Sequence, residues 1–265
     1  MSRFKVFIEY EGTRYSGWQV QKNARTVQGE LLDAAKGIFN TNEVELYGSG
    51  RTDAGVHALR QVAHLDVKTM LAPEIIRVKL NDILPADINV LEVEKTHKDF
   101  HARHDAVLRS YIYQISKRRT AFGKRYVWWI KKELDVKKMD EAAKLFVGMN
   151  DLQSFTSDDP EEKSTKVKIE SITLKEVDDL LLIRIEGSHF LWNLVRKVVG
   201  VLVEVGHHKI SIQQVEQFIG MKSEEPSQYI APPSGLFLER VYYEGEKRQT
   251  ALGREQSIVN IFKKV

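Results

Sequence analysis

The sequence predicts an α+β protein made of two related units, each with the order β-α-β-β-α-β of the split βαβ (RRM-like or ferredoxin-like) arrangement. Apolar and polar residues alternate over short stretches, which is typical of half-buried strands. Between these stretches apolar residues recur every three or four positions, which is typical of amphipathic helices. The second half of the chain repeats the order of the first. We expect units at residues 1–105 and 106–265, forming an extended antiparallel sheet with a central positively charged cleft.

In the first unit, several residues predict where strands and helices begin. The alternation of Phe4, Val6 and Ile8 predicts the first strand. Thr26 is an N-cap before one helical apolar pattern, and Pro73 opens a second such pattern as a first-turn residue. The strands are expected at residues 3–10, 43–47, 61–67 and 88–93, and the helices near residues 27–39 and 73–83.

The second unit is expected to repeat this order with insertions. Residues 107–115 alternate as a strand, and Asp178 with Asp179 marks the turn of a hairpin. Ser211 is the expected N-cap of the last helix. The other strands are expected at residues 168–176, 180–186 and 236–243, with a short extra strand near 126–130, and the helices at 139–147, 191–205 and 211–218.

The composition excludes several classes of protein and site. The chain has no cysteine, so disulfides, thiolate nucleophiles and cysteine-ligated zinc are excluded. The longest apolar stretch, residues 198–205, is broken by Gly200 and Glu204 and is too short to span a bilayer. The first residues lead directly into an alternating pattern and do not resemble a signal peptide. We therefore expect a cytoplasmic protein with no membrane partner.

Positive charge is concentrated in one part of the chain. Residues 97–138 hold 12 Lys or Arg against 4 Asp or Glu, a net charge of +8, whereas the whole chain carries only +3. The same segment is rich in Phe, Tyr and Trp. Basic side chains attract phosphates and aromatic faces stack unpaired bases, so this segment favours a nucleic-acid partner. The alternative is a solvated basic face over aromatic residues of the core.

The loop after the second expected strand is the strongest candidate for an active site. Residues 48–58 read GSGRTDAGVHA and place Arg51 and Asp53 among three glycines. Glycine lets a backbone turn sharply and approach a ligand closely, and an aspartate beside an arginine on such a loop suits a catalytic carboxylate. Taken alone, the same residues also fit an ordinary solvated turn.

Several segments give the sequence a resemblance to a known family. Residues 50–57 resemble the G-R-T-D-A-G-V-H signature of the tRNA pseudouridine synthase A family. Further matches are IEYEGT and YSGWQ within residues 8–19, FHAR at 100–103, YIY at 111–113, SF at 154–155, and Phe190 with VRKVVG at 195–200. The resemblance extends over nearly the whole chain, and its most specific parts are the loop and the VRKVVG segment.

The resemblance implies a particular reaction. A uridine at position 38, 39 or 40 in the anticodon arm of tRNA has its N1–C1′ bond cleaved, the uracil turns in place, and a C5–C1′ bond forms. The target base must leave its stack, which costs on the order of a few kcal/mol. The family needs no cofactor and no metal. The resemblance also suggests a homodimer, with one tRNA reaching across both subunits.

The resemblance also implies roles for individual residues. Asp53 is expected to be the essential carboxylate, acting as a nucleophile on the sugar or the base, or as a base; the residues do not choose among these. Tyr111 is expected to stack on the target uracil and to help move a proton. Arg196 is expected to pair with Asp53 and hold it ionised. The expected RNA contacts are Arg51, Tyr111, Phe100, His101, Ala102, Arg103, His104 and Lys163.

One segment departs from the family pattern. Residues 158–162 carry four carboxylates where a loop that contacts tRNA is expected, and carboxylates near phosphates repel. Two outcomes are open. Either Lys163, Ser164 and Lys166 alone make contact, or the loop moves aside.

Two other functions remain to be weighed. A catalytically silent RNA-binding protein could use the same sheets, although it would not need Asp53. A metal-dependent nuclease could use Asp53, His57, His64 and Asp66 as ligands. Histidines at this spacing are more often hydrogen-bonded structural residues, so we expect no metal site.

Overall fold

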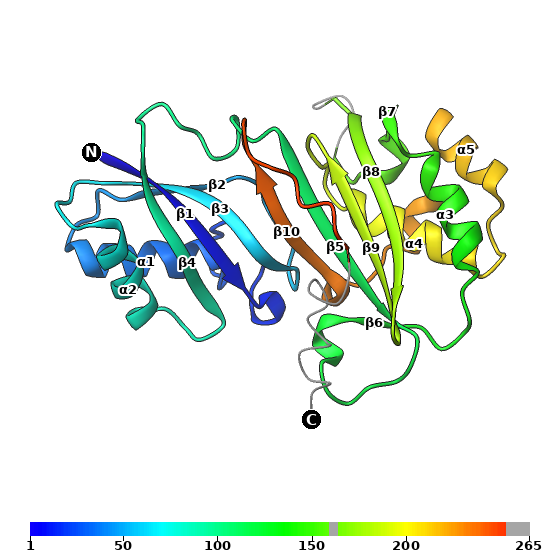
Figure 1. The fold of residues 1–265 in the computed structure, drawn as a ribbon, viewed down its shortest axis with the longest axis horizontal. Coiled ribbons are helices and arrows are strands. Elements are labelled where there is room, and N and C mark those ends of the chain that lie inside the picture. The colour runs from blue at the N-terminus through cyan, green and yellow to red at the C-terminus, as the bar shows by residue number, and fades with distance from the viewer. Residues whose placement is uncertain (159–163, 253–265) are drawn as a thin grey trace. The chain divides into compact units, whose positions relative to one another are not determined.

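The computed structural model describes residues 1–158 and 164–252 (Figure 1). The described residues divide into two compact units, one of residues 1–107 with 237–247 and the other of residues 108–158, 164–236 and 248–252. Both units combine strands with helices, so the α+β class is confirmed. The last strand lies in the first unit, whereas the sequence order placed it with the second half.

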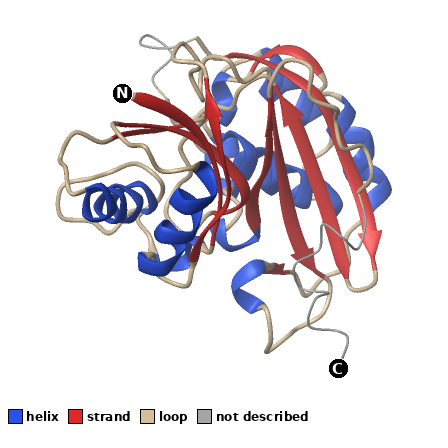
Figure 2. Ribbon diagram, turned by 60° about the vertical axis from the view of Figure 1, so that its left-hand side comes forward, coloured by secondary structure: helices blue, strands red, loops and turns tan. Residues whose placement is uncertain are grey.

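The first unit is a mostly antiparallel sheet with helices on one side (Figures 1 and 2). Its strands have the order β4-β1-β3, and β2 and β10 also pair with β3. Only β10 runs parallel to its neighbour, through Phe237 opposite His57 and Leu238 opposite Ala58. The elements are β1 (Ser2–Tyr10), α1 (Val27–Phe39), β2 (Glu45–Gly48), β3 (His57–Val67), α2 (Pro73–Ile83), β4 (Ile88–Thr96) and β10 (Leu236–Tyr242).

The helices of this unit begin where their sequence signals lie. The Thr26 side chain accepts a hydrogen bond from the backbone N–H of Gly29, which satisfies a free donor in the first turn of α1. Asn40 ends α1 in the left-handed conformation, with φ of 49°. Pro73 occupies the first turn of α2, where its missing N–H costs nothing. These predicted boundaries are confirmed.

The second unit also carries its helices on one side of a sheet (Figure 2). Its strands have the order β5-β9-β8-β7, all antiparallel, and the short β6 pairs parallel with β5. The predicted hairpin is confirmed, with Asp178 in the left-handed conformation at its turn. The elements are β5 (Leu108–Ser116), β6 (Trp128–Trp129), α3 (Val136–Lys144), β7 (Gly148–Asp151), β8 (Lys166–Val177), β9 (Leu180–Gly187), α4 (Leu194–Gly206) and α5 (Ile212–Gly220).

Several elements of this unit differ from the sequence expectation. Strand β7 was not expected, and α3 ends at Lys144 and not at residue 147. All nine residues of β5 are buried, although the alternating pattern indicated one polar face. Its polar residues Arg109, Ser110 and Gln114 are buried together with its apolar ones. Helix α4 begins at Leu194 and not at residue 191, because Asn193 adopts the left-handed conformation with φ of 63° and separates the preceding turn from the helix.

Candidate active site

Asp53 lies in the loop between β2 and β3, and this loop is closed by bonds to its own hairpin. The Ser49 backbone N–H donates to the carbonyl of Val62 over 2.8 Å. Gln61 accepts from the Ser49 hydroxyl over 2.6 Å and donates to the Gly50 carbonyl over 3.1 Å. The Asp53 carbonyl accepts from Val56 over 3.1 Å, so Asp53 opens a tight turn.

Burial alternates along this loop. Thr52 is buried and its hydroxyl lies 2.8 Å from the phenol oxygen of Tyr10, whereas Arg51 is exposed and Asp53 is partly exposed. Gly55 supplies the positive φ, 78°, that the turn requires. The backbone of the loop is therefore held by hydrogen bonds, while Arg51 is exposed and Asp53 is partly exposed. This arrangement suits a carboxylate that must meet a large substrate.

Tyr111 lies on β5 in the second unit. It is opposite Ile185 of β9, and only 7% of it is exposed. Its ring meets the edge of the Phe190 ring, with centroids 4.9 Å apart and planes at 74°. This edge-to-face contact favours one ring orientation. The structure thus places two of the family-matched aromatic residues against each other.

Arg196 lies in the first turns of α4, also in the second unit. Its Nε donates to the carbonyl of Ala231 over 2.7 Å and its terminal nitrogen donates to the Asn193 side chain over 3.1 Å. The Ala231 N–H returns a bond to the Arg196 carbonyl over 3.1 Å. These two acceptors are neutral oxygens, and together they orient the guanidinium.

Lys197, next along α4, is a buried cation that the sequence did not single out. Its ammonium group donates to the carbonyl of Thr156 over 2.5 Å and to the hydroxyl of Ser227 over 2.9 Å. Burial lowers the pKa of Lys197, and the nearby Glu224 opposes this shift. The lysine ties α4 to two segments that lie far from it in the sequence. An apolar spacing pattern gives no signal for such a contact.

The FHARH segment, residues 100–104, contains both core and surface side chains. Phe100 and Ala102 are buried, and the Ala102 backbone bonds to His64 and to the Tyr243 hydroxyl. Their side chains therefore belong to the interior of the first unit and are not available as RNA contacts. Arg103 and His104 are exposed and His101 is partly exposed, so these three remain candidates.

The residues of the alternative metal site have other partners. Nδ1 of His57 accepts from the Gly12 N–H over 2.9 Å, and Nδ1 of His64 accepts from the Ala102 N–H over 3.2 Å. Asp66 accepts from Nε of Arg3 over 2.7 Å. Burial, with the positive charges of Arg3 and His101 nearby, lowers the pKa of His64 to about 4. Within residues 1–158 and 164–252, no three His, Asp or Glu side chains are grouped to hold a metal ion.

Five cations of the basic segment lie in the loop between β5 and β6, residues 117–127, and are candidates to bind phosphates: Lys117, Arg118, Arg119, Lys124 and Arg125. Lys117 pairs with Glu176 over 2.8 Å, and Arg118 pairs with Asp179 over 2.6 Å. Arg119 lies over the ring of Trp129, 5.9 Å from its centroid. Two of the five cations are thus already paired with carboxylates of the same surface. Lys163 and the acidic residues 159–162 lie outside the described residues, while the Asp158 carboxylate accepts from the Trp192 N–H over 2.8 Å.

None of the helices in the described ranges has the length and apolar character needed to cross a membrane.

Comparison with known proteins gives consistent results. The model of a family described as tRNA pseudouridine synthase matches residues 6–105 and 142–244. The chain is 36% identical to tRNA pseudouridine synthase A 1 of Protochlamydia amoebophila over 251 residues, covering 93% of this chain and 98% of that protein. It is 39% identical to tRNA pseudouridine synthase A of Afipia carboxidovorans over 246 residues, covering 92% of this chain and 100% of that protein.

Proposed function

The chain belongs to the tRNA pseudouridine synthase A family and is an isomerase that acts on tRNA, and we propose that it converts uridines 38, 39 and 40 of the anticodon arm, with Asp53 as the essential carboxylate. The observation that carries this proposal is the loop of residues 49–56. Its backbone is bonded on both sides of Asp53, while Asp53 itself is partly exposed.

The proposed reaction rearranges two bonds and conserves the atoms of the nucleoside. The target uridine leaves its stack, the N1–C1′ bond breaks and a C5–C1′ bond forms. The proton on C5 leaves, and N1 ends with a proton. Asp53 attacks the sugar or the base, or removes a proton, and each of these roles needs the ionised carboxylate.

Tyr111 and Arg196 complete the proposed site. We propose that the Tyr111 ring stacks on the extruded uracil and that Arg196 pairs with Asp53, which would keep the carboxylate ionised and oriented. The support for Arg196 is the fixed orientation of its guanidinium, which donates to the Ala231 carbonyl and to the Asn193 side chain. The support for Tyr111 is its fixed ring orientation against Phe190. Exposed Arg51 and Arg103 would contact the RNA backbone.

The enzyme is proposed to act in the cytoplasm as a homodimer that binds one tRNA across two subunits. This assembly follows from family resemblance. Light scattering of the protein alone and with tRNA measures the mass of both species. A monomer that is fully active at assay concentration would contradict the dimer.

The test of the site of modification uses three altered anticodon arms. Purified protein is incubated with an arm carrying uridine at 38, 39 and 40, and with arms in which each uridine in turn is replaced by cytidine. Chemical mapping is expected to show pseudouridine at the remaining uridines and nowhere outside these positions. Turnover on a prefolded arm is expected to continue in EDTA. Modification only at other uridines would contradict the proposed substrate.

A further inference from the structure

The loop that carries Asp53 rests on a second segment, residues 11–18, which lies between β1 and α1. The Trp18 N–H donates to the carbonyl of Thr52 over 3.1 Å. The Gly55 N–H donates to the carbonyl of Tyr15 over 3.3 Å. One bond precedes Asp53 and the other follows it, so the two together restrict where its backbone can lie.

Glycines in residues 11–18 allow the backbone of this segment to lie close to the backbone of the Asp53 loop. Gly17 has φ of 89°, and a Cβ added there would lie 2.5 Å from the Thr52 carbonyl oxygen and 3.2 Å from the carbonyl carbon of Asp53. A Cβ added at Gly12 would lie 2.0 Å from the Val56 oxygen. In contrast, a Cβ at Gly50, within the Asp53 loop, would meet nothing within 4 Å. The crowding therefore occurs where the two segments meet, at Gly12 and Gly17, and not at Gly50.

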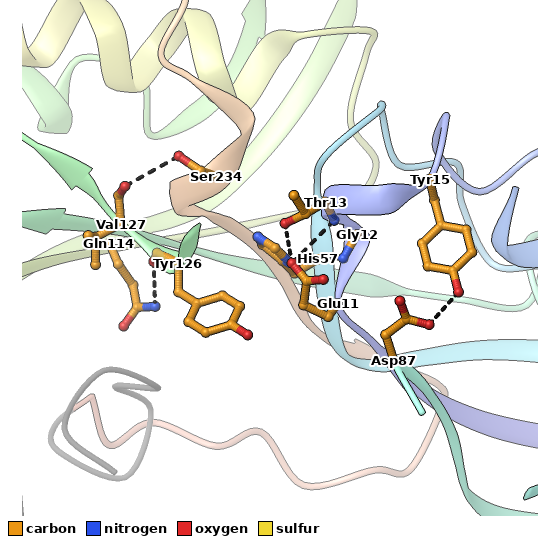
Figure 3. Close-up of polar contacts among 10 residues, drawn as sticks. All are labelled: Glu11, Gly12, Thr13, Tyr15, His57, Asp87, Gln114, Tyr126, Val127 and Ser234. Carbon is orange, nitrogen blue, oxygen red and sulfur yellow. Dashed lines mark hydrogen bonds and ion pairs between the residues drawn. The ribbon is translucent and has the colours of Figure 1, made fainter. Parts of the chain in front are cut away.

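The segment is itself anchored to the body of the first unit (Figure 3). The Tyr15 hydroxyl donates to Asp87 over 2.5 Å, and Gly12 donates to buried His57 over 2.9 Å. The carbonyls of Gly17 and Trp18 accept from Val27 and Gln28 in the first turn of α1. Burial and the bond to Asp87 raise the pKa of Tyr15, so its hydroxyl keeps the donated proton at neutral pH.

We propose that residues 11–18 form a positioning element for the reaction, with Gly17 and Tyr15 as positioning residues that set the place of the Asp53 carboxylate. The inference rests on the proposed role of Asp53. Its physical basis is that a displacement of about 1 Å in a reacting group costs about 100-fold in rate. Gly17 sets the distance between the two backbones, and Tyr15 fixes the segment to Asp87.

The test compares two glycine-to-alanine variants, one at a positive φ against a neighbouring backbone and one in an open position of a helix. Gly17→Ala introduces the collision, whereas Gly37→Ala in α1 adds a methyl group with nothing within 4 Å. For Gly17→Ala we expect the single-turnover rate at saturating tRNA to fall about 100-fold per folded molecule, with the Kd for tRNA within about twofold of wild type. Gly37→Ala is expected to retain the wild-type rate and Kd.

Tyr15→Phe is the milder second variant and decides the question if Gly17→Ala does not fold. It removes only the hydroxyl bonded to Asp87, so we expect a fall of about five- to tenfold in the saturated rate and an unchanged Kd. The proposal is overturned if the folded variants keep the wild-type saturated rate. It is also overturned if only Kd weakens, because the segment would then be an RNA contact.

Asp53→Asn, measured in parallel, separates this inference from the proposed function. If Asp53→Asn is active, the assignment of the carboxylate fails and the positioning role fails with it. If Asp53→Asn is inactive while Gly17→Ala and Tyr15→Phe turn over at the wild-type saturated rate, only the positioning role fails.

Discussion

The Asp53 loop of the first unit and the basic loop of the second unit are held in different ways. Thr52 is buried and bonded through both its hydroxyl and its carbonyl. In the basic loop, residues 117–127, the ion pairs of Lys117 and Arg118 are exposed, and Phe122 is 80% exposed. Exposed pairs contribute little to stability. The expected contribution of the Asp53 loop therefore depends on where its backbone lies. The expected contribution of the basic loop depends on the sum of several charges.

This difference predicts two kinds of mutational response. A change at Asp53 or at its supports alters the one carboxylate proposed to react, so its expected effect on the chemical step is large. A change in the basic loop removes one of several similar contacts, so its effect on binding is graded and depends on salt. The following experiments test this contrast, from the largest expected effect to the smallest.

Asp53→Asn is expected to lower the single-turnover rate by about 10⁴-fold or more while leaving the Kd for tRNA nearly unchanged. The amide keeps the shape of the carboxylate but is a poor nucleophile and a poor base. Tritium release from tRNA labelled at C5 of uridine measures the rate. Asp82→Asn, an exposed change on α2, is the matched control and should be fully active. Appreciable turnover by Asp53→Asn would remove this residue from the mechanism.

Tyr111→Phe is expected to bind tRNA nearly normally and to react slowly, whereas Tyr111→Ala should lose both. In the proposed site the ring would supply stacking, about 1–3 kcal/mol per base by alanine substitution, and the hydroxyl would supply a contact for proton transfer. Because the ring packs against Phe190, the alanine variant also needs a check of its unfolding midpoint. A wild-type chemical step in Tyr111→Phe would leave only the stacking role.

Two combined variants test the graded response of the basic loop. Replacing Arg119 and Lys124 with alanine should reduce the slope of log K against log salt by about 1.4, since each phosphate contact contributes roughly −0.7. Replacing Lys117 and Arg118 should change it by less than about 1, because Glu176 and Asp179 already pair with them. Titrations with tRNA at several salt concentrations measure both slopes. If the Arg119 and Lys124 variant keeps the wild-type slope, the loop is only a solvated surface.

His64 is expected to affect stability at acid pH and not the rate. Its folded pKa of about 4 lies below the unfolded value of 6.5, so the unfolded chain binds the proton first. Stability is therefore lost as the pH falls from 6.5 to about 4, by about 3 kcal/mol in all from this residue. His64→Gln keeps an acceptor for Ala102 but does not titrate. Its unfolding midpoint should fall less over this pH range; an equal fall would contradict the prediction.

Local signals in the sequence predicted much of the fold. Thr26, Pro73 and the Asp178–Asp179 turn act on neighbouring backbone groups, so their effects do not depend on the rest of the chain. The parallel pairing of Phe237 with His57 is different, because it joins residues far apart in the sequence. No local pattern distinguishes a closing strand of one unit from an added strand of the other.

The candidate site also has features that the sequence shows and features that only the structure shows. The sequence alone identified the Asp53 loop, Tyr111 and Arg196, because glycines, a carboxylate and a family pattern are visible residue by residue. It did not separate Phe100 and Ala102 from the exposed Arg103 and His104, since burial depends on what packs around each side chain.

The sequence by itself determined the α+β class, the family and the identity of the residues proposed to react. Only the tertiary structure decided how the Asp53 loop is supported, with Gly17 against Thr52 and Tyr15 bonded to Asp87. The physical reason is that residue type and spacing fix which local conformations and chemistries are available. Backbone contacts between distant segments depend on the packing of the whole unit, and that packing sets where a reacting group lies.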